Sequence, residues 1–335
     1  MKYSRLGSTG TYISKIALGT LDFGIHISEE ESFKIMDKAL DLGINLFDTA
    51  NVYGQTIGKF GLSESIIGKW LDKNKDKRKG LILNTKCSMK LDDARYGCND
   101  NNGISAYKMR NQFNDSLERL KTDYVDILTI HFYDEDYNWK EIWDEYERLF
   151  VQDKVIYAGA SNFSSYAIAK CQQEAEKRNL LGLVSEQNRY NICCRQVEIE
   201  MTSALKKEEI SLLTWNPLFG GRLTSKVFNQ PTNGRQFNNA LTESLKNKLK
   251  EYFESCEQYG LLGSDVALSW LLHNDNVSSI LLGVQNVEEL EEATKCLDLM
   301  IPHELQQKIE DIFPGYSSAP YFYNSMKANN GWQGD

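Results

Sequence analysis

Four polar side chains that follow apolar runs could together move a proton. Asp48, Lys86 and His131 each come at the end of a short apolar segment, and Tyr53 comes soon after Asp48. If these segments are parallel strands of a closed sheet, their carboxyl ends share one face, where a carboxylate, an ammonium, an imidazole and a phenol would meet. Such a set predicts proton transfer to or from a substrate oxygen.

The four residue types suggest separate roles. A phenol has an ordinary pKa of about 10, so Tyr53 is a weak proton donor unless its anion is stabilised. An ammonium at Lys86 is expected to lower the pKa of Tyr53, and Asp48 would keep Lys86 charged and oriented. His131 would position or polarise the substrate oxygen. Taken singly, each residue also fits a plain structural role, but their joint occurrence at successive strand ends favours a catalytic one.

Composition limits the classes of protein to consider. The chain has 335 residues, of which 41% are hydrophobic and 25% charged, as in an ordinary soluble globular protein. Its formal net charge of -9 argues against a nucleic-acid partner, which needs a basic stripe. Seven cysteines without metal-ligand spacing, behind an N-terminus that lacks an apolar signal segment, predict a cytoplasmic protein with no metal site. No apolar run reaches the length of about 18 residues that a membrane helix needs, so no membrane partner is expected.

Short apolar, β-branched runs alternate with longer stretches of helical period, which is the pattern of βα units and a parallel sheet. Strands are expected near residues 16–19, 45–47, 81–85, 125–130, 155–158, 183–185, 211–214 and 278–282. Without a Pro- or Gly-rich linker between halves, they favour one α/β domain, a (β/α)₈ TIM barrel over residues 1–335. Residues 1–18 should form a hairpin that plugs the barrel bottom, and residues 313–335 a C-terminal tail.

Helix signals fill the gaps between the strands. Ser28 followed by Glu31 predicts a capping box, and the helix that it starts should stop at Gly43. Further helices are expected at roughly 62–72, 104–121, 139–152, 165–178, 196–207, 240–259, 264–273, 287–297 and 303–312.

The sequence resembles the aldo-keto reductase family over about residues 1–312. One signature joins Asp48-Thr49-Ala50 and Tyr53-Gly54 to Gly61, Ser63-Glu64 and Gly68, and a second joins Ser116-Leu117, Arg119-Leu120 and Asp123-Tyr124 to the run ending at His131. Ser161-Asn162-Phe163, Gln187 with Tyr190-Asn191, and Trp215-Asn216-Pro217-Leu218 extend the likeness. Within the family, the chain looks most similar to the nucleotide-deoxysugar ketoreductases and 2,3-enoyl reductases.

This resemblance implies NADP(H) or NAD(H) as cofactor. Hydride transfer needs a cofactor because no side chain can donate a hydride. In the family, the residues matching Ser161, Asn162 and Gln187 hold the nicotinamide carboxamide, the aromatic residue matching Trp215 stacks on the ring, and a glycine-bearing loop approaches the pyrophosphate. The implied cofactor contacts are Gly19, Thr20, Asp48, Ser161, Asn162, Gln187, Trp215, Asn216, Pro217, Leu218, Gly220, Arg222, Lys226, Gly283, Gln285 and Glu289.

One segment departs from the family pattern. After Gly283 the family commonly has an arginine or lysine, then a glutamine and an asparagine; here the matching residues are Gln285, Glu289 and Ala293. A glutamate near the ribose can accept hydrogen bonds from a free 2′-hydroxyl but would repel a 2′-phosphate. The departure makes NAD(H) a candidate beside NADP(H), with Lys226 as another source of positive charge.

Long loops would roof the substrate pocket at the C-terminal face, namely residues 87–103, 219–239 and the tail from 314. Phe23, Tyr53, His131 and Phe132 are expected to line this pocket. Other aromatic residues on the loops are Tyr96, Tyr133, Tyr316, Tyr321, Phe322 and Tyr323, some of which could simply pack the lids. Aromatic faces together with phenols suit a ring that carries hydroxyls better than a bare alkyl chain.

The sequence as a whole predicts an oxidoreductase that transfers a hydride between a nicotinamide cofactor and a carbonyl or alcohol of a sugar-like small molecule, with Tyr53 as general acid and base. A sugar enoyl reductase is a second hypothesis, because C=C reduction uses the same hydride. A third is a cofactor-sensing regulatory subunit resembling potassium-channel β-subunits, which share the fold and the four residues. The physiological substrate, the reaction direction and the oligomeric state are not predicted.

Overall fold

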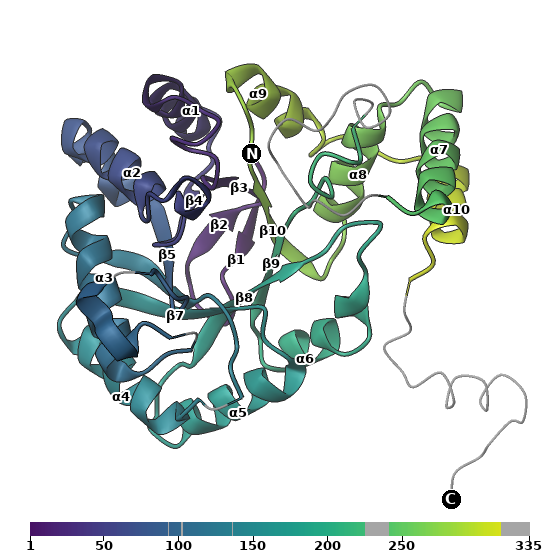
Figure 1. Ribbon diagram of the computed structural model, residues 1–335. Coiled ribbons are helices and arrows are strands. Elements are labelled where there is room, and N and C mark those ends of the chain that lie inside the picture. The colour runs from purple at the N-terminus through teal and green to yellow at the C-terminus, as the bar shows by residue number, and fades with distance from the viewer. Residues whose placement is uncertain (93, 102, 136, 225–240, 316–335) are drawn as a thin grey trace, which may run out of the picture.

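The computed structural model describes residues 1–92, 94–101, 103–135, 137–224 and 241–315, and its centre is a closed barrel of eight parallel strands inside a ring of helices (Figure 1). The barrel order is β10-β3-β4-β5-β6-β7-β8-β9. The strands are β3 (Ile16–Gly19), β4 (Leu46–Asp48), β5 (Ile82–Cys87), β6 (Val125–Ile130), β7 (Val155–Ser161), β8 (Leu183–Arg189), β9 (Ser211–Trp215) and β10 (Val277–Leu282). The predicted (β/α)₈ fold is thus confirmed. Lys226 and the tail beyond residue 315 lie outside the described residues.

The N-terminal hairpin closes one end of the barrel. Strands β1 (Tyr3–Arg5) and β2 (Tyr12–Ser14) pair antiparallel, and Leu6 and Ile13 are fully buried in an apolar cluster formed with inward side chains of the barrel strands. The backbone N–H of Gly7 donates to the hydroxyl of Ser211, the first residue of β9, at 2.7 Å. The hairpin therefore fills the amino end of the barrel and leaves the carboxyl end for polar residues.

The helices agree closely with the sequence pattern, apart from one. Their bounds are α1 (Glu29–Asp41), α2 (Leu62–Lys73), α3 (Ala106–Leu120), α4 (Trp139–Val151), α5 (Ser165–Glu176), α6 (Met201–Lys207), α7 (Glu243–Gln258), α8 (Gly263–Leu272), α9 (Val287–Lys295) and α10 (His303–Ile312). The single helix expected over 196–207 is wrong, because a 3₁₀ turn at Gln196–Glu198 precedes α6. Glu198 pairs with Arg195 at 2.7 Å and accepts a hydrogen bond from Tyr190 at 2.6 Å, which fixes that turn.

Side-chain caps explain where several helices begin. The hydroxyl of Ser28 accepts the backbone N–H of Glu31 at 3.2 Å, which is one of the two hydrogen bonds of the predicted capping box. The carboxylate of Glu31 contributes to an ion pair with Lys34 at 3.4 Å. Thr242 caps α7 in the same way as Ser28 caps α1, through the N–H of Leu245, so this helix begins slightly later than expected.

Gly68 allows α2 and α3 to approach each other closely. A Cβ at this position would lie 2.0 Å from the carbonyl oxygen of Arg119, a backbone atom that cannot easily move. We therefore expect Gly68→Ala to lower the free energy of unfolding by about 1–3 kcal/mol, measured by urea denaturation. Gly10→Ala is the matched control, because a Cβ there meets nothing within 4 Å. Equal midpoints for the two variants would contradict this account of the helix contact.

Candidate active site

The barrel brings all four predicted catalytic residues together at its carboxyl end. Asp48 is the last residue of β4, Lys86 lies in β5, His131 follows β6, and Tyr53 lies in the turn after β4. The ammonium of Lys86 donates to Asp48 Oδ2 at 2.6 Å and to the Tyr53 hydroxyl at 3.0 Å. The rings of Tyr53 and His131 meet edge to face with centroids 6.1 Å apart. A continuous chain thus runs from a carboxylate through an ammonium to a phenol.

Neighbouring amides hold the Asp48–Lys86 pair in place. Asp48 Oδ1 accepts hydrogen bonds from Asn84 Nδ2 at 2.6 Å and from Gln187 Nε2 at 2.8 Å, and Lys86 also donates to the Thr49 carbonyl at 2.9 Å. The two charged side chains are almost fully buried, with 3% and 2% of their surfaces exposed. A buried ion pair is stable only when its remaining polar atoms are also bonded, and here they are. The geometry of the pair is therefore fixed.

Burial sets the protonation state of the phenol. Loss of hydration raises the pKa of Tyr53 above its ordinary value, and the nearby Lys86 opposes this rise without cancelling it. The predicted fall in this pKa is therefore wrong in net direction, because the sequence shows the cation but not the loss of hydration. Burial also disfavours the charge on Lys86, yet Asp48 and Tyr53 raise the pKa of Lys86 overall. At neutral pH the phenol is protonated and the amine is charged.

His131 is a neutral imidazole beside the phenol. Burial, and then the charge of Lys86, place the pKa of His131 well below its ordinary value. Its Nδ1 atom is buried and has no hydrogen-bond partner among the described residues. Phe132 stacks on the imidazole with ring centroids 5.4 Å apart and has 47% of its surface exposed. His131 and Phe132 therefore lie on one side of the mouth, the carboxyl end of the barrel.

The residues expected to hold the nicotinamide lie on neighbouring strand ends. The hydroxyl of Ser161 donates to the Gln187 carbonyl at 3.0 Å, and Asn162 Nδ2 donates to Ser161 Oγ at 2.9 Å and to the His131 carbonyl at 3.0 Å. Trp215 Nε1 and Asn216 Nδ2 are buried and have no partner among the described residues. Unpartnered buried donors are costly, so this side of the mouth fits a ligand rich in acceptor oxygens, as a nicotinamide dinucleotide is.

The loop after β9 has the backbone needed for close approach to a ligand. Phe219, Gly220 and Gly221 have φ values of 52°, 65° and 82°, in the left-handed region where glycine costs least. The N–H of Gly220 donates to Asn216 Oδ1, which fixes the start of the loop. Pro217 is buried and Leu218 packs against the core, while the guanidinium of Arg222 lies 5.3 Å from the Phe219 ring.

Two predicted contacts need correction. The hydroxyl of Thr20 is fully buried and donates to the Asp48 carbonyl at 2.9 Å, so only the backbone of Thr20 is left for the predicted cofactor contact. Phe23 has 1% of its surface exposed and packs in the main core, so it does not line the pocket. Leu21, between them, lies in the turn after β3 and has 53% of its surface exposed.

Comparison with known proteins gives the chain its family. A family model described as the aldo/keto reductase family matches residues 15–313. The chain belongs to the aldo/keto reductase family. Membership indicates an oxidoreductase, in agreement with the predicted class.

The chain is similar to several relatives over nearly its whole length. It is 38% identical to YrpG of Bacillus subtilis (strain 168), an uncharacterized oxidoreductase. The alignment spans 317 residues, which are 94% of this chain and 97% of the relative. It is 29% identical to a putative aryl-alcohol dehydrogenase of Schizosaccharomyces pombe, over 92% and 95% of the two chains. It is 27% identical to Protein tas of Escherichia coli (strain K12), over 95% and 99%. None of these names refers to deoxysugars, so that narrower resemblance gains no support.

A buried lysine holds together the two ends of the segment between β5 and α3. Lys108 donates to the carbonyls of Ser88 at 2.7 Å and Gly103 at 3.1 Å, and also to that of Asn101. Ser88 Oγ in turn accepts the N–H of Phe132 at 3.3 Å, which links this segment to the residue after His131. The sequence reasoning missed Lys108, because a lysine in the first turns of a helix resembles a surface residue.

The segment expected to meet the adenosine carries carboxylates. The backbone N–H of Gln285 donates to Glu289 Oε2 at 2.8 Å, and Gln285 Nε2 lies 3.3 Å from Asp22 Oδ2. Ala293 is buried at 6% exposure. Asp22, which the sequence reasoning did not single out, thus adds a second carboxylate beside Gln285. The three matching positions supply no cation.

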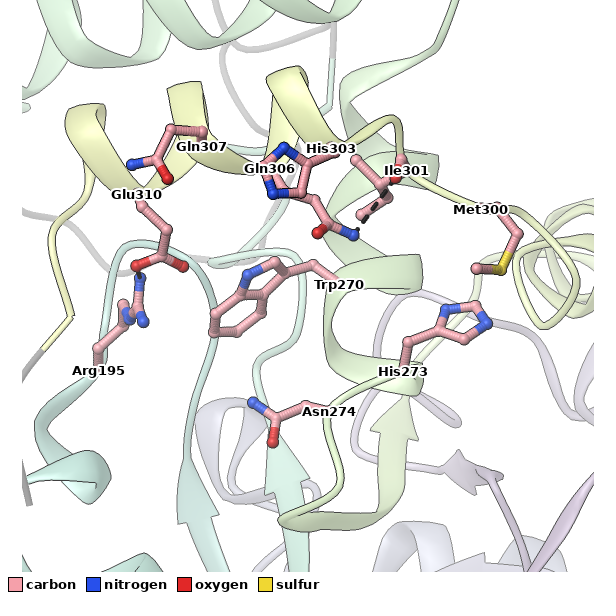
Figure 2. A pocket seen from close by; sticks show the side chains of 10 residues that line it. All are labelled: Arg195, Trp270, His273, Asn274, Met300, Ile301, His303, Gln306, Gln307 and Glu310. Atoms are coloured by element: carbon pink, nitrogen blue, oxygen red, sulfur yellow. Dashed lines mark hydrogen bonds and ion pairs between the residues drawn. The ribbon is translucent and has the colours of Figure 1, made fainter.

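A separate cavity of about 370 Å³ lies outside the barrel, between α8, α10 and the segment after β8 (Figure 2). None of the four predicted catalytic residues lines it. Arg195, which does, bonds to Glu198 at 2.7 Å and Glu310 at 2.6 Å, so its charge is already compensated.

In the described part of the chain, no helix has the length and apolar character required to cross a bilayer.

Proposed function

We propose that this aldo/keto reductase transfers a hydride between a nicotinamide dinucleotide and a carbonyl or alcohol carbon of a sugar-like substrate, with Tyr53 as general acid and base. The observation that carries the proposal is the hydrogen-bonded chain from Asp48 to Lys86 at 2.6 Å and from Lys86 to Tyr53 at 3.0 Å, at the open end of the barrel beside His131.

The residues act on the proton in a definite order. During reduction the substrate oxygen gains negative charge, and the protonated hydroxyl of Tyr53 supplies a proton to it. Lys86 stabilises the resulting phenolate, and Asp48 keeps Lys86 charged. The neutral imidazole of His131 directs an N–H toward the same oxygen and stabilises its developing charge. In alcohol oxidation the proton returns to Tyr53 by the reverse path.

The other half of the mouth would hold the cofactor, which supplies the hydride when bound. Asn162, Ser161 and Gln187 would bind the carboxamide, and Trp215 would stack on the nicotinamide ring. The unpartnered donors Trp215 Nε1 and Asn216 Nδ2 support this placement. Cofactor and phenol would then lie on opposite sides of the substrate carbonyl.

Exposed apolar surface around the phenol supports a substrate with a ring. Phe132, which stacks on His131, is 47% exposed, and the Tyr53 phenol adds a polar group. A ring with hydroxyls offers a C–H face to the first and oxygens to the second. The similarity to a putative aryl-alcohol dehydrogenase of Schizosaccharomyces pombe adds aromatic alcohols as a second class to test.

A substrate panel with purified protein tests this function. NADH and NADPH are titrated first, and each is then offered with sugar ketones, aromatic aldehydes and a sugar enone matched to a saturated ketone. Reduction of the ketones or aldehydes supports the proposal, whereas reduction of the enone alone would favour the enoyl reductase. Tight cofactor binding without turnover on any of these substrates would favour the regulatory-subunit hypothesis.

Cofactor choice gives a prediction of its own. Charge-assisted hydrogen bonds to a 2′-phosphate are worth roughly 1.5–3 kcal/mol each, and the carboxylates of Glu289 and Asp22 offer none. We therefore expect NADH to bind at least as tightly as NADPH. Gln285→Arg combined with Glu289→Gln should tighten NADPH binding by about tenfold and leave NADH binding nearly unchanged, because only the phosphate gains a partner. Fluorescence titration measures both constants.

Asp22 determines how this experiment should be controlled. An arginine at position 285 would come close to the Asp22 carboxylate, which lies 3.3 Å from the present amide and could bind the new cation. The single variant Gln285→Arg and the triple variant with Asp22→Asn separate that effect from the effect of Glu289. Much tighter binding of NADPH than of NADH by the unmodified protein would show that this reading of Glu289 is wrong.

A further inference from the structure

Arg189 is a cation at the mouth of the barrel that finds no counter-ion in the described part of the chain. It is the last residue of β8 and is in register with Trp215, the last residue of β9. Its guanidinium lies 5.9 Å from the centre of the Trp215 ring and makes no hydrogen bond or ion pair with any described residue. Every other arginine whose side chain the structure describes makes a hydrogen bond or an ion pair.

The strand geometry places this side chain on the inner face. Side chains two residues apart on a strand emerge on the same face. Gln187 reaches Asp48 inside the barrel at 2.8 Å, so the face that it shares with Arg189 is the interior one. Arg189 lies two residues beyond Gln187, closer to the carboxyl end of the strand, and is half-buried. Its guanidinium therefore lies at the rim, on the side of the mouth formed by β8 and β9.

Comparison with other arginines shows how unusual an unpaired one is. Arg195, six positions further along the chain, bonds to both Glu198 and Glu310, and Figure 2 shows it directed at the second. Arg119 pairs with Glu64 at 2.7 Å. The chain has 47 acidic residues for 38 basic ones, so carboxylates are abundant. A half-buried cation that no described carboxylate meets gains its partner most simply from a ligand.

Two buried donors without partners in the described part of the chain lie near Arg189 on the adjoining strand end. Trp215 Nε1 and Asn216 Nδ2 are buried donors with no partner among the described residues. Arg222 is close to the same thiol as Arg189. Burial raises the pKa of the Cys194 thiol, and the charges of Arg189 and Arg222 both lower this pKa. Two guanidinium groups therefore lie within electrostatic range of one thiol. This combination suits a ligand group that carries negative charge on oxygen.

We propose that Arg189 binds an anionic group, a phosphate or a carboxylate, of the ligand that lies over Trp215. A guanidinium can present two parallel N–H groups to two such oxygens. The proposal rests on the proposed function for the identity of the ligand. The anion is either the pyrophosphate of the dinucleotide or an acid group on the sugar-like substrate.

Arg189→Met separates the two sources of the anion. If the anion is the pyrophosphate, the variant should bind both NADH and ADP-ribose at least about tenfold more weakly, since each carries that group. If the anion is on the substrate, both affinities should stay unchanged. The ratio of kcat/KM for glucuronate to that for glucose should then fall by at least about tenfold, because only glucuronate carries a carboxylate. Titration calorimetry and initial rates measure these quantities.

Two further variants control the experiment. Arg189→Lys keeps the charge but loses the fork of N–H groups, so its losses should be smaller than those of Arg189→Met. Lys170→Met removes one exposed positive charge on α5, outside the barrel, and should change neither affinity nor selectivity. Arg189→Gln repeats the test with a polar side chain if the methionine variant does not fold.

The outcomes distinguish this proposal from the proposed function. Unchanged NADH and ADP-ribose affinities together with an unchanged glucuronate-to-glucose ratio overturn the role of Arg189, while carbonyl reduction by the unmodified protein still stands. If the unmodified protein binds NADH but reduces no carbonyl, the reductase function fails, and the ADP-ribose titration still decides whether Arg189 binds the pyrophosphate. Absence of NADH and ADP-ribose binding together with absence of turnover would overturn both proposals.

Discussion

Tyr53→Phe is expected to lower kcat for carbonyl reduction by about 10²–10⁴-fold and to leave cofactor affinity nearly unchanged. The substitution removes only the hydroxyl that lies 3.0 Å from Lys86. The ring keeps its edge-to-face contact with His131, and Lys86 keeps Asp48 and the Thr49 carbonyl as partners. The defect should therefore appear in the proton transfer and not in the fold. Steady-state rates and a cofactor titration on the same preparation separate the two.

A second tyrosine provides the control for this variant. Tyr252 is a buried residue of α7 whose hydroxyl donates to the Gly263 carbonyl at 2.6 Å, far along the chain from the four predicted catalytic residues. Tyr252→Phe removes the same hydroxyl group and should lower stability without lowering kcat. If Tyr53→Phe keeps nearly full turnover, Tyr53 is not the proton donor and the proposed mechanism fails.

The sequence was most informative where one physical signal dominates. Val125–Ile130 and Ile16–Gly19 are strands over the predicted residues, because continuous apolar, β-branched runs suit the fully buried strands of a barrel. The positions of Asp48, Lys86 and His131 follow from the same rule, since each comes where such a run ends. The meeting of these side chains could therefore be predicted from strand order alone.

The sequence was least informative at the polar ends of the strands. Leu183–Ser185 was expected as a strand, but β8 continues through Gln187 to Arg189. Polar residues near a strand end resemble a loop in the sequence, although here they form the upper layers of the barrel interior. Arg189 was missed for this reason. Its lack of a counter-ion is a property of the packed structure that no sequence pattern contains.

Side-chain direction and hydration were also beyond the sequence. Phe23 was expected at the pocket because it follows a strand, yet it turns into the core and has 1% of its surface exposed. The pKa of Tyr53 was expected to fall because of Lys86, yet burial raises it overall. Both errors arise because burial depends on elements distant in the chain, whereas the sequence shows only near neighbours.

The raised pKa of Tyr53 leads to a second prediction, for Lys86→Met. Burial raises this pKa, and Lys86 is the first of the groups that oppose the rise, so removing its charge should raise the pKa further. Alcohol oxidation needs the ionised phenol as base. Its rate should therefore fall by at least about 100-fold near neutral pH, and the rising limb of its pH profile should move to higher pH. The measurement is kcat for oxidation across the alkaline range, compared with the unmodified protein.

Lys86→Met leaves the buried Asp48 carboxylate without its cation, which lowers the free energy of unfolding, so urea denaturation accompanies the kinetics. Without the ammonium, Asp48 still accepts hydrogen bonds from Asn84 at 2.6 Å and Gln187 at 2.8 Å, so the carboxylate is not left without donors. Lys86→Arg keeps a cation near the phenol and should shift the pH profile less than Lys86→Met does. A slow Lys86→Met enzyme with an unshifted pH profile would mean that Lys86 orients Tyr53 without tuning its acidity. Since Asp48 and Lys86 are held rigidly below the phenol, we expect the shift, because a fixed buried charge acts on a neighbouring acid more strongly than a mobile, solvated one.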